Sequence, residues 1–484
     1  MEVNYLDILK PYAEYGLTMS QEKNNVGHYS PSISNPGSEE SLEWKIMCAI
    51  KKFEDKGQVT GSQVCVVDGK GQTLANVVSG HLGGLKQNVS MSADTLVFGW
   101  SVTKAVSATL AHLMVQEGYL TYDEPICQRV WPAFCPSESA PEELFRSSMV
   151  DMDDSIRRWS WKRRITLRHI LTHSSGMWSS LPRNSTIEKI SSCEKCCAAF
   201  EFDVNLPGDT LLPVDEPGKK CIYHFMSFGW LVAGSLMGAF RIRHDREKVT
   251  YEEVYDTLLK PRLSSHIINT GFKPCGGTDD KTFTLNDSPF NMIGMVQKRR
   301  ESMVMGEEME EIPILDKGKD NSHKKYSDLM QIVRGNEFLL DPRVWNCQKA
   351  LKAHIPAAAG RFSAEALAHF YHELGTGNII NSITLAKATE TVCTESELQN
   401  RLQGATLMSS TNLESTKTNF GLGYQIIKLG GTKNVGFGHA GIGGSIGFFH
   451  KESNTAVAIM LNKTVENVDV SNTIILAISK YLAW

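Results

Sequence analysis

The 484-residue sequence lacks an excess of charge of either sign. It contains 50 lysine and arginine residues against 54 aspartate and glutamate residues, so its formal net charge is only -4. Proteins that hold nucleic acid or an anionic membrane by electrostatic attraction carry a basic excess. We therefore expect neither nucleic acid nor a membrane surface as a partner, and we look for function in individual sites.

Long hydrophobic runs are also missing. The longest apolar stretch, GWLVAGSLMGAF at 229–240, is well short of the ~20 residues of a membrane-spanning helix, so it predicts a buried helix instead. The first residues lack the basic and then apolar blocks of a secretory signal. The eleven cysteines are scattered and odd in number, which favours reduced thiols. These features predict a soluble, intracellular protein, first of all a cytoplasmic one, with an organelle still open; they say nothing about oligomeric state.

A zinc-finger pattern is absent as well. Cys193, Cys196 and Cys197 form the one tight cysteine cluster, but no second Cys/His pair with finger-like spacing follows them. We expect these thiols to be ordinary packed side chains.

Two stretches resemble a dinucleotide-binding motif and a metalloprotease motif, but the residues around them do not fit either kind of site. The GFGHAG stretch at 436–441 fits Gly-x-Gly-x-x-Gly, but glycines and a predicted strand follow it where a dinucleotide site needs a helix. His372 is followed by Glu373, but Thr376 stands where a zinc-protease helix has its second histidine. We therefore expect no metal and no organic cofactor.

Both ends of the chain have the patterning of a sheet. From Ser62, the run SQVCVVD, a Gly-Lys-Gly turn and the run QTLANVVSG predict a β-hairpin. Near the other end GYQIIKL, GSIGFF and TAVAIMLN have the same signature, and 468–484 predicts a closing amphipathic helix.

The middle of the chain differs, because it has helical spacing with few strand signals. Helices are expected at 105–117, 230–239, 251–260 and 364–374, and the segment 297–325, dense in charge of both signs, predicts a solvated loop. The expected fold class is α/β (α+β), with an antiparallel sheet formed from both chain ends and flanked by helices. The expected organisation is one bilobed domain: an extension at 1–43, a sheet lobe at 44–100 and 350–484, and an inserted, mainly helical lobe at 101–349.

A serine and a lysine three residues apart begin the predicted helix in FGWSVTKAVSATLAHLMVQEGYL. Ser101 stands at the helix start, where free N–H groups and the helix dipole favour negative charge. Lys104 returns one turn later on the same face. A desolvated lysine loses its proton more easily, and as a neutral amine it can take the serine proton. The alternative is a helix cap followed by a solvated lysine, but the apolar context favours a buried lysine.

Three further stretches follow in a recognisable order: ITLRHILTHSSGM at 165–177, EPGKKCIYHFMSFGWLVAGSLMG at 216–238 and GFGHAGIGGSIGFFH at 436–450. With them the chain resembles the serine β-lactamase and penicillin-binding-protein superfamily. The resemblance covers about residues 60–465 and is nearest to the β-lactamase-related branch of class C-like enzymes, esterases and D-amino-acid peptidases. It implies the DD-peptidase/β-lactamase-like arrangement of a sheet lobe and a helical lobe.

The resemblance implies roles for individual residues. Ser101 would be acylated, with Lys104 as its base, and Tyr223 would move protons to the leaving group. The third element of the family maps onto His439, Ala440 and Gly441, and His439 together with backbone amides would steady the oxyanion. The amide of Ile442 would be the second oxyanion donor beside that of Ser101.

One position departs from the family pattern. The family's Tyr-x-Asn element is Tyr223, His224 and Phe225 here, so the asparagine that binds an amide in β-lactamases is missing. The variant resembles an esterase-like subgroup, including plant proteins in which such a domain follows an ABC1-type kinase-like domain. His224 either replaces the lost polar contact with substrate or is merely packed in the wall. His173, in the 165–177 stretch, is expected to be structural.

The sequence thus predicts a serine hydrolase that forms an acyl-enzyme with an ester or small amide substrate, a small molecule. The alternative is a catalytically retired member of the same fold that acts as a scaffold or binding protein. A rival nucleophile, Ser445 in GGSIG at 443–447, fits the Gly-x-Ser-x-Gly pattern of α/β-hydrolases. The order of the later residues excludes it. An α/β-hydrolase needs an acidic residue and then a histidine after its serine, and no histidine follows an acidic residue after Ser445.

Overall fold

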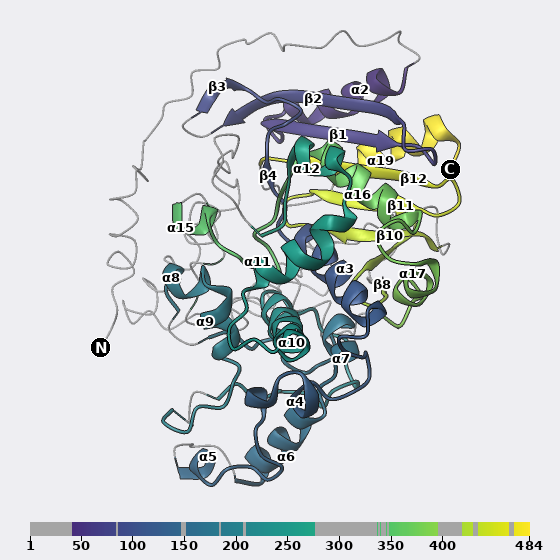
Figure 1. The fold of residues 1–484 in the computed structure, drawn as a ribbon. Helices are drawn as coiled ribbons and strands as arrows, with labels where there is room; N and C mark the ends of the chain where they lie inside the picture. Colours follow the sequence, from purple (N-terminus) through teal and green to yellow (C-terminus); the bar gives the residue numbers. More distant parts are fainter. Residues whose placement is uncertain are drawn as a thin grey trace, which may run out of the picture.

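The computed structural model describes residues 41–83, 86–146, 152–182, 185–206, 210–275, 336, 339, 345, 348–394, 419–428, 434–463 and 469–484. The expected charged loop at 297–325 and residues 1–40 of the expected extension lie outside them. The fold combines helices with an antiparallel sheet, as the sequence predicts (Figure 1).

The main sheet brings the two ends of the chain together. Its nine described strands have the order β3-β2-β1-β12-β11-β10-β9-β8-β7, and all their pairings are antiparallel. The two ends of the chain meet where β1 pairs with β12, with Val64 opposite Ile459. The strands are β1 Gly61–Val67, β2 Thr73–Gly83, β3 Lys86–Ser90, β7 Cys393–Thr394, β8 Asn419–Phe420, β9 Gln425–Lys428, β10 Asn434–Ala440, β11 Ile446–His450 and β12 Thr455–Leu461.

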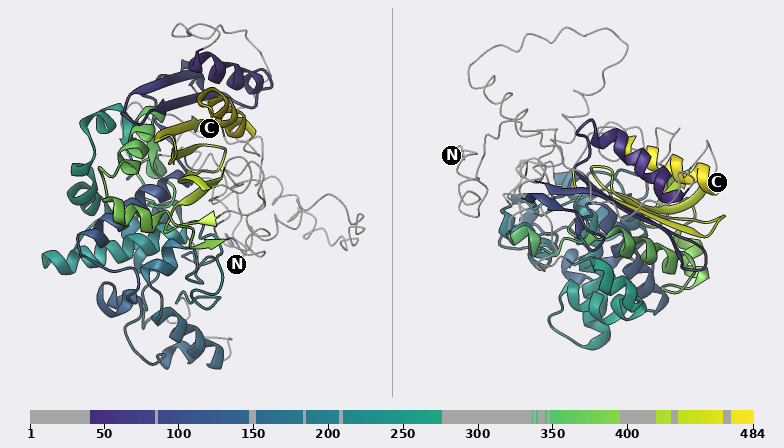
Figure 2. Two further views of the ribbon diagram at one scale, coloured as in Figure 1. Left: turned by 90° about the vertical axis from the view of Figure 1, so that its right-hand side faces the viewer. Right: turned by 90° about the horizontal axis from the view of Figure 1, so that it is seen from above.

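Helices cover both faces of this sheet (Figure 2). Successive side chains of a strand point to opposite faces. On β1, Val64 and Val66 pack with α2 (Leu42–Glu54) and α19 (Asp469–Leu482), whereas Cys65 and Val67 face the other core. That second core contains residues of α16 (Ala364–Gly375) and α3 (Val102–Gln116). Burial on both faces explains why β1 is apolar from Val64 to Val67 and does not alternate there.

The helical part is built around two buried helices. Every residue of α3 from Val102 to Met114 is buried, and so is every residue of α10 (Ser227–His244) from Ser227 to Phe240. The remaining helices are α4 Ile126–Arg129, η1 Pro132–Phe134, α5 Glu143–Arg146, α6 Met152–Arg163, α7 Leu167–Leu171, α8 Ile187–Ile190, α9 Cys193–Ala198, α11 Tyr251–Val254, η3 Tyr255–Leu259, η4 Lys260–Arg262, α12 Ser265–Gly271, α15 Gln348–Leu351 and α17 Ser382–Ala388. No described helix is long and apolar enough to cross a lipid bilayer.

A small three-stranded sheet leads into α3. It has the order β4-β6-β5, from β4 (Val97–Phe98), β6 (Arg361–Phe362) and β5 (Phe272–Lys273). Because β4 ends three residues before Ser101 and β6 lies beside it, this sheet fixes the approach to the predicted nucleophile.

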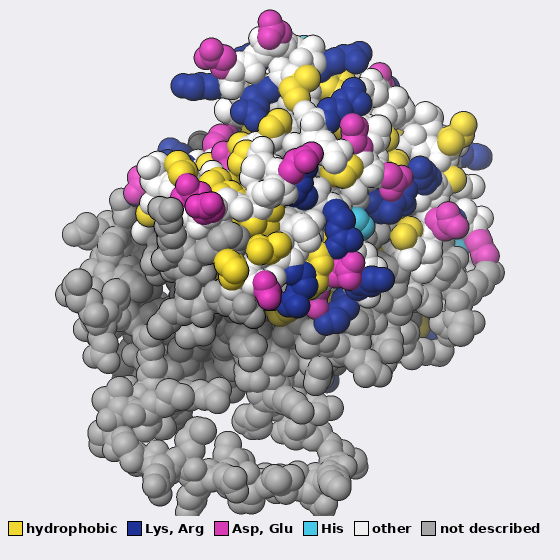
Figure 3. Space-filling view, turned by 90° about the horizontal axis from the view of Figure 1, so that it is seen from below, with side chains coloured by type: hydrophobic (Ala, Val, Ile, Leu, Met, Phe, Trp, Pro, Cys, Tyr) yellow, Lys and Arg dark blue, Asp and Glu magenta, His cyan; other side chains and the backbone are white. Residues whose placement is uncertain are grey.

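The cysteine cluster and the surface charges lie outside the site. The thiols of Cys193, Cys196 and Cys197 are buried on α9, and those of Cys196 and Cys197 donate to backbone carbonyls, so they are packed thiols as expected. On the face shown in Figure 3, basic and acidic side chains are interspersed over the described residues, and neither sign forms a large patch.

Candidate active site

A strained turn presents Ser101 at the start of α3. Trp100, immediately before it, has a φ of 47°, which is rare for a bulky residue. Aromatic packing stabilises this conformation, because the Trp100 ring lies edge-on to Phe98 at 4.8 Å and to Trp345 at 5.5 Å between centroids. The N–H of Gly99 donates to Gly360 O at 2.8 Å and ties the same turn to the strand beside it.

Lys104 lies within hydrogen-bond distance of that serine. Its Nζ is 3.1 Å from Ser101 Oγ and 3.1 Å from Ala357 O, and its side chain is fully buried. Lys104 forms no ion pair within the described chain, and burial lowers its pKa well below the usual value. The amine is therefore readily neutral. One of its hydrogens then bonds to the Ala357 carbonyl, and its lone pair can accept the Ser101 proton.

Tyr223 reaches the same place from the segment that precedes α10. Its side chain is 3% exposed, and its ring centroid lies 4.9 Å from Lys104 Nζ. On its other side the ring lies 6.2 Å from that of His439, between centroids. The structure thus brings together four side chains that the sequence places at 101, 104, 223 and 439.

His439 comes from β10 and is fully buried. Its Nδ1 lies 2.7 Å from Ala440 O, and a carbonyl only accepts, so Nδ1 carries the proton. Burial, with Lys104 close by, lowers the pKa of His439 to about 3, so the ring is neutral. Its Nε2 then presents a lone pair, and it has no hydrogen-bond partner among the described residues. This tautomer accepts a hydrogen bond at Nε2, so it does not suit the oxyanion-donor role that the sequence suggested for His439.

His173 and His224 form the wall behind Tyr223. The His173 ring lies 4.6 Å from that of Tyr223, and its Nδ1 accepts from the His224 N–H at 3.1 Å. His224 donates from Nδ1 to Ile222 O at 2.7 Å, and its Nε2 lies 2.6 Å from Ser175 Oγ. Both ring nitrogens of His224 therefore have partners inside the protein. This arrangement supports the alternative in which His224 is packed in the wall and does not contact the substrate.

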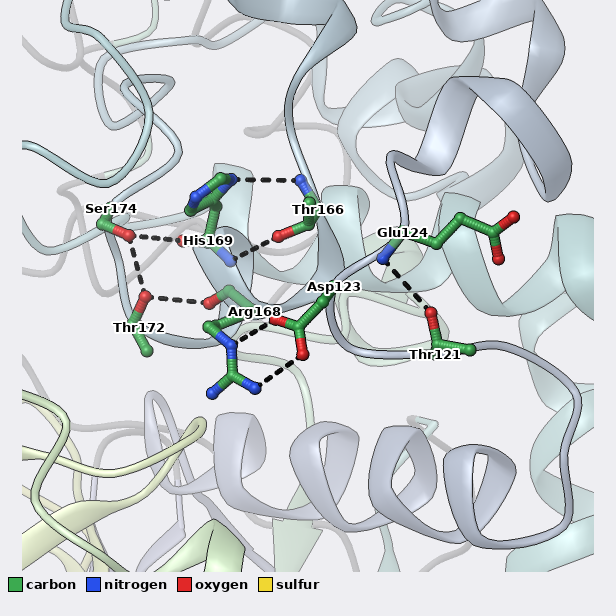
Figure 4. A network of polar contacts seen from close by, with 8 residues as sticks. All are labelled: Thr121, Asp123, Glu124, Thr166, Arg168, His169, Thr172 and Ser174. Atoms are coloured by element: carbon green, nitrogen blue, oxygen red, sulfur yellow. Dashed lines mark hydrogen bonds and ion pairs between the residues drawn. The ribbon is translucent and has the colours of Figure 1, made fainter.

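A network of polar contacts stabilises the segment that leads to His173 (Figure 4). Thr166 caps α7 by accepting from the His169 N–H, while its own N–H donates to His169 Nδ1. Arg168 donates to both carboxylate oxygens of Asp123, at 2.5 and 2.9 Å, and this pairing lowers the pKa of Asp123. Thr172, just before His173, donates to Arg168 O at 2.8 Å.

The predicted oxyanion donors lie where β10 ends. A Cβ on Gly441 would meet Gly99 O at 2.5 Å, so only glycine lets this strand end approach the turn before Ser101. The Gly441 N–H is used, because it donates to Ser445 O at 2.7 Å. Within the described residues, the N–H groups of Ser101 and Ile442 donate to no other group.

Sequence reasoning missed two features of this site. One is the Ala357 carbonyl, which orients Lys104; a backbone oxygen far away in the chain leaves no mark in a motif. The other is the left-handed backbone at Trp100. The FGW lead-in indicated only an apolar context.

The comparisons with known proteins agree with this fold. Residues 49–480 match the model of the family described as Beta-lactamase. The chain belongs to the β-lactamase family. It is 26% identical over 380 residues to the "Esterase/beta-lactamase LipL" of Mycobacterium tuberculosis, a match that covers 78% of this chain and 71% of that protein.

Two solved structures of this family's fold illustrate the likeness. A penicillin-binding protein homologue from Caulobacter crescentus superposes with a TM-score of 0.63 at 18% identity, covering 94% of this chain and 100% of that one. A family VIII carboxylesterase gives a TM-score of 0.62 at 15% identity, covering 93% and 100%. At these identities the likeness supports the fold.

Proposed function

We propose that this member of the β-lactamase family is a serine hydrolase that forms an acyl-enzyme with an ester or small amide. The observation that carries the proposal is the 3.1 Å contact between Ser101 Oγ and the Nζ of a fully buried Lys104. Burial lowers the pKa of Lys104 and so favours its neutral, basic form, and the Ser101 hydroxyl that it contacts stands at the start of a helix.

The reaction proceeds in two halves. Ser101 Oγ attacks the substrate carbonyl carbon as its proton passes to Lys104 Nζ, and the N–H groups of Ser101 and Ile442 donate to the resulting oxyanion. As the intermediate collapses, Tyr223 delivers a proton to the departing oxygen or nitrogen and is reprotonated by Lys104, which returns to the neutral amine. Water then attacks the acyl group, and its proton restores Ser101. His439 lies beside Tyr223, and in this scheme its Nε2 lone pair accepts a hydrogen bond from the bound substrate.

The substrate class follows from the family resemblance and from the composition of the wall. Phe225, 6% exposed, occupies the position of the asparagine that binds lactam side chains, and His224 has no nitrogen left for a substrate amide. We therefore favour esters and small amides over lactams. The names of the relatives, an esterase/β-lactamase and a family VIII carboxylesterase, are in line with this choice.

Labelling with a fluorophosphonate probe tests the proposal. The parent protein should be labelled at Ser101 and should hydrolyse p-nitrophenyl butyrate, and Ser101→Ala should abolish both. Ser445→Ala is the matched control, because Ser445 is a buried serine in a motif-like context whose hydroxyl, among the described residues, bonds to the Leu461 backbone. Equal labelling of the parent and Ser101→Ala would disprove the assignment. No labelling of a folded parent would favour the retired scaffold instead.

A further inference from the structure

Three potential metal ligands lie close together on the helices α12 and α16. His266 on α12 and Glu365 and His369 on α16 each offer one ligand atom, and these atoms all lie within 4.8 Å of one another. Glu365 and His369 are four residues apart, so they lie on one face of the helix. His266 Nε2 is 3.2 Å from Glu365 Oε1, and the rings of His266 and His369 are 4.4 Å apart between centroids.

Neighbouring polar groups already orient these ligands. Asn76 Nδ2 donates to Glu365 Oε2 at 2.9 Å and leaves the other carboxylate oxygen facing His266. Thr73 Oγ1 lies 3.2 Å from His369 Nε2. Such outer contacts are typical of metal sites, where they fix the direction of each ligand.

A cavity of about 450 Å³ opens beside the cluster. His266 and His369 line it together with His372, which is 9% exposed and whose buried Nδ1 has no hydrogen-bond partner among the described residues.

We propose that His266, Glu365 and His369 bind a divalent transition-metal ion, Zn²⁺ above all, with the fourth position open to the cavity. Two imidazoles and one carboxylate suit zinc. At Zn–N and Zn–O distances of about 2.0–2.1 Å, the ligands of a tetrahedral ion lie roughly 3.3 Å apart. The 3.2 Å separation of His266 and Glu365 matches this value, and the His369 ligand atom, within 4.8 Å of both, would draw closer on binding.

The position of the site indicates what it does. None of the four proposed catalytic side chains lines this cavity. The ion would instead tie α12 to α16, and α12 continues into β5 of the small sheet whose β4 leads to Ser101. The site is therefore structural: it stabilises the approach to the nucleophile and takes no part in acyl transfer.

Zinc titration of the full-length protein tests this inference. After dialysis against a chelator and then metal-free buffer, calorimetry should show one equivalent of Zn²⁺ bound. His266→Gln and His369→Gln should each weaken that binding by at least about 100-fold, and Asn76→Ala by about tenfold. Zn²⁺ should raise the Tm of the parent and leave that of the two histidine variants unchanged.

The chain supplies a matched control. His354 lies 3.7 Å from Glu252, a His–Glu pair without a second histidine, so His354→Gln should bind zinc like the parent. Co²⁺ in place of Zn²⁺ should give a spectrum without a thiolate charge-transfer band, which distinguishes this site from the cysteines. No binding by the parent, equal binding by His369→Gln, or a thiolate band would each overturn the proposal, and none of them bears on the Ser101 chemistry.

Discussion

Lys104 and Lys162 are chemically similar and differ in their neighbours. Both are fully buried, and each donates to a backbone carbonyl and lies over an aromatic ring, which is Tyr223 for Lys104 and Phe134 for Lys162. Only Lys104 has a hydroxyl nucleophile within reach. The proposed catalytic base therefore differs from the structural lysine by a single contact, the one with the Ser101 hydroxyl.

The lysine pair provides the first prediction. Lys104→Met should lower kcat with p-nitrophenyl butyrate by about 10²- to 10⁴-fold, because Ser101 loses its base. Lys162→Met removes a buried lysine of the same kind and should leave kcat per folded molecule unchanged. Steady-state kinetics together with circular dichroism would separate loss of chemistry from loss of folding. A similar loss of kcat in both variants would contradict the assigned role of Lys104.

The depressed pKa of Lys104 predicts a pH dependence. The base form is the neutral amine, so kcat/KM should fall as the pH drops through the lowered pKa, and it should be on its plateau well below pH 10.5. The free energy of unfolding also increases as the pH rises. The unfolded chain binds the lysine proton more tightly, so this group makes the fold more stable as pH rises between the two pKa values. A pH–rate profile that rises only near pH 10 would contradict this prediction.

Tyr223 allows a test that depends on the leaving group. If it protonates the departing atom, Tyr223→Phe should slow alkyl esters and small amides by about 10²-fold or more. It should slow p-nitrophenyl esters much less, because p-nitrophenolate departs without a proton. Comparing kcat for a p-nitrophenyl ester and an ethyl ester of the same acid measures this ratio. An equal loss with both substrates would assign Tyr223 to packing.

The motif residues could be found from sequence because side-chain chemistry requires fixed residue types at short spacing. Ser101 and Lys104 are one helical turn apart, so a helix alone brings them together. The protonation and tautomer of His439 could not be found in this way. They depend on the Ala440 carbonyl and on complete burial, and both arise only when β10 packs against α3.

Among the elements, the packing of α10 against the site predicts a remote effect on catalysis. A Cβ on Gly229 would lie 2.4 Å from Ala357 N, and the Ala357 carbonyl is a partner of Lys104. Gly229→Ala should therefore destabilise the fold by about 1–3 kcal/mol and also lower kcat, because it displaces that carbonyl. Denaturant unfolding and kinetics on the folded fraction would measure both effects.

Gly234→Ala is the comparison for this variant. A Cβ at Gly234 would meet the ring of Trp131 at 2.2 Å, away from Lys104, so it should cost stability without lowering kcat per folded molecule. If Gly229→Ala were destabilised while its kcat stayed at the parent value, the link between α10 and the lysine would be refuted.

The elements themselves were predictable where periodicity is strong. The β1–β2 hairpin, strands β11 and β12 and the buried α10 all lie where patterning placed them. The expected helix at 251–260 is a short α11 that continues as the π-helical turn η3 and then as the 3-10 turn η4, which contains Pro261 and ends at Arg262. The helix α2 was missed, because polar residues precede it and its apolar face is short.

At the scale of the whole molecule, the two parts of the fold share one core. A single apolar cluster contains Val67 of β1, Leu110 of α3 and Leu236 of α10, so it extends from the sheet into the helical region. The sequence suggested two lobes, because patterning along the chain shows where sheet and helix alternate. It could not show that α3 is buried between them, since this burial depends on contacts between distant segments.

A shared core predicts that sheet and helices unfold together. Leu236→Ala in α10 leaves a cavity and should destabilise the protein by about 2–5 kcal/mol, and Val67→Ala on β1 should act in the same direction by a smaller amount. Each variant should shift the unfolding transition seen by tryptophan fluorescence, to which Trp131, Trp159 and Trp230 in the helical part contribute among nine tryptophans, and the transition seen by the far-ultraviolet signal of the whole fold by the same amount. Two separate transitions, with Leu236→Ala moving only the fluorescence, would show that the lobes fold independently. Coincident transitions would mean that the geometry around Ser101, built from both lobes, persists only while the entire core is intact.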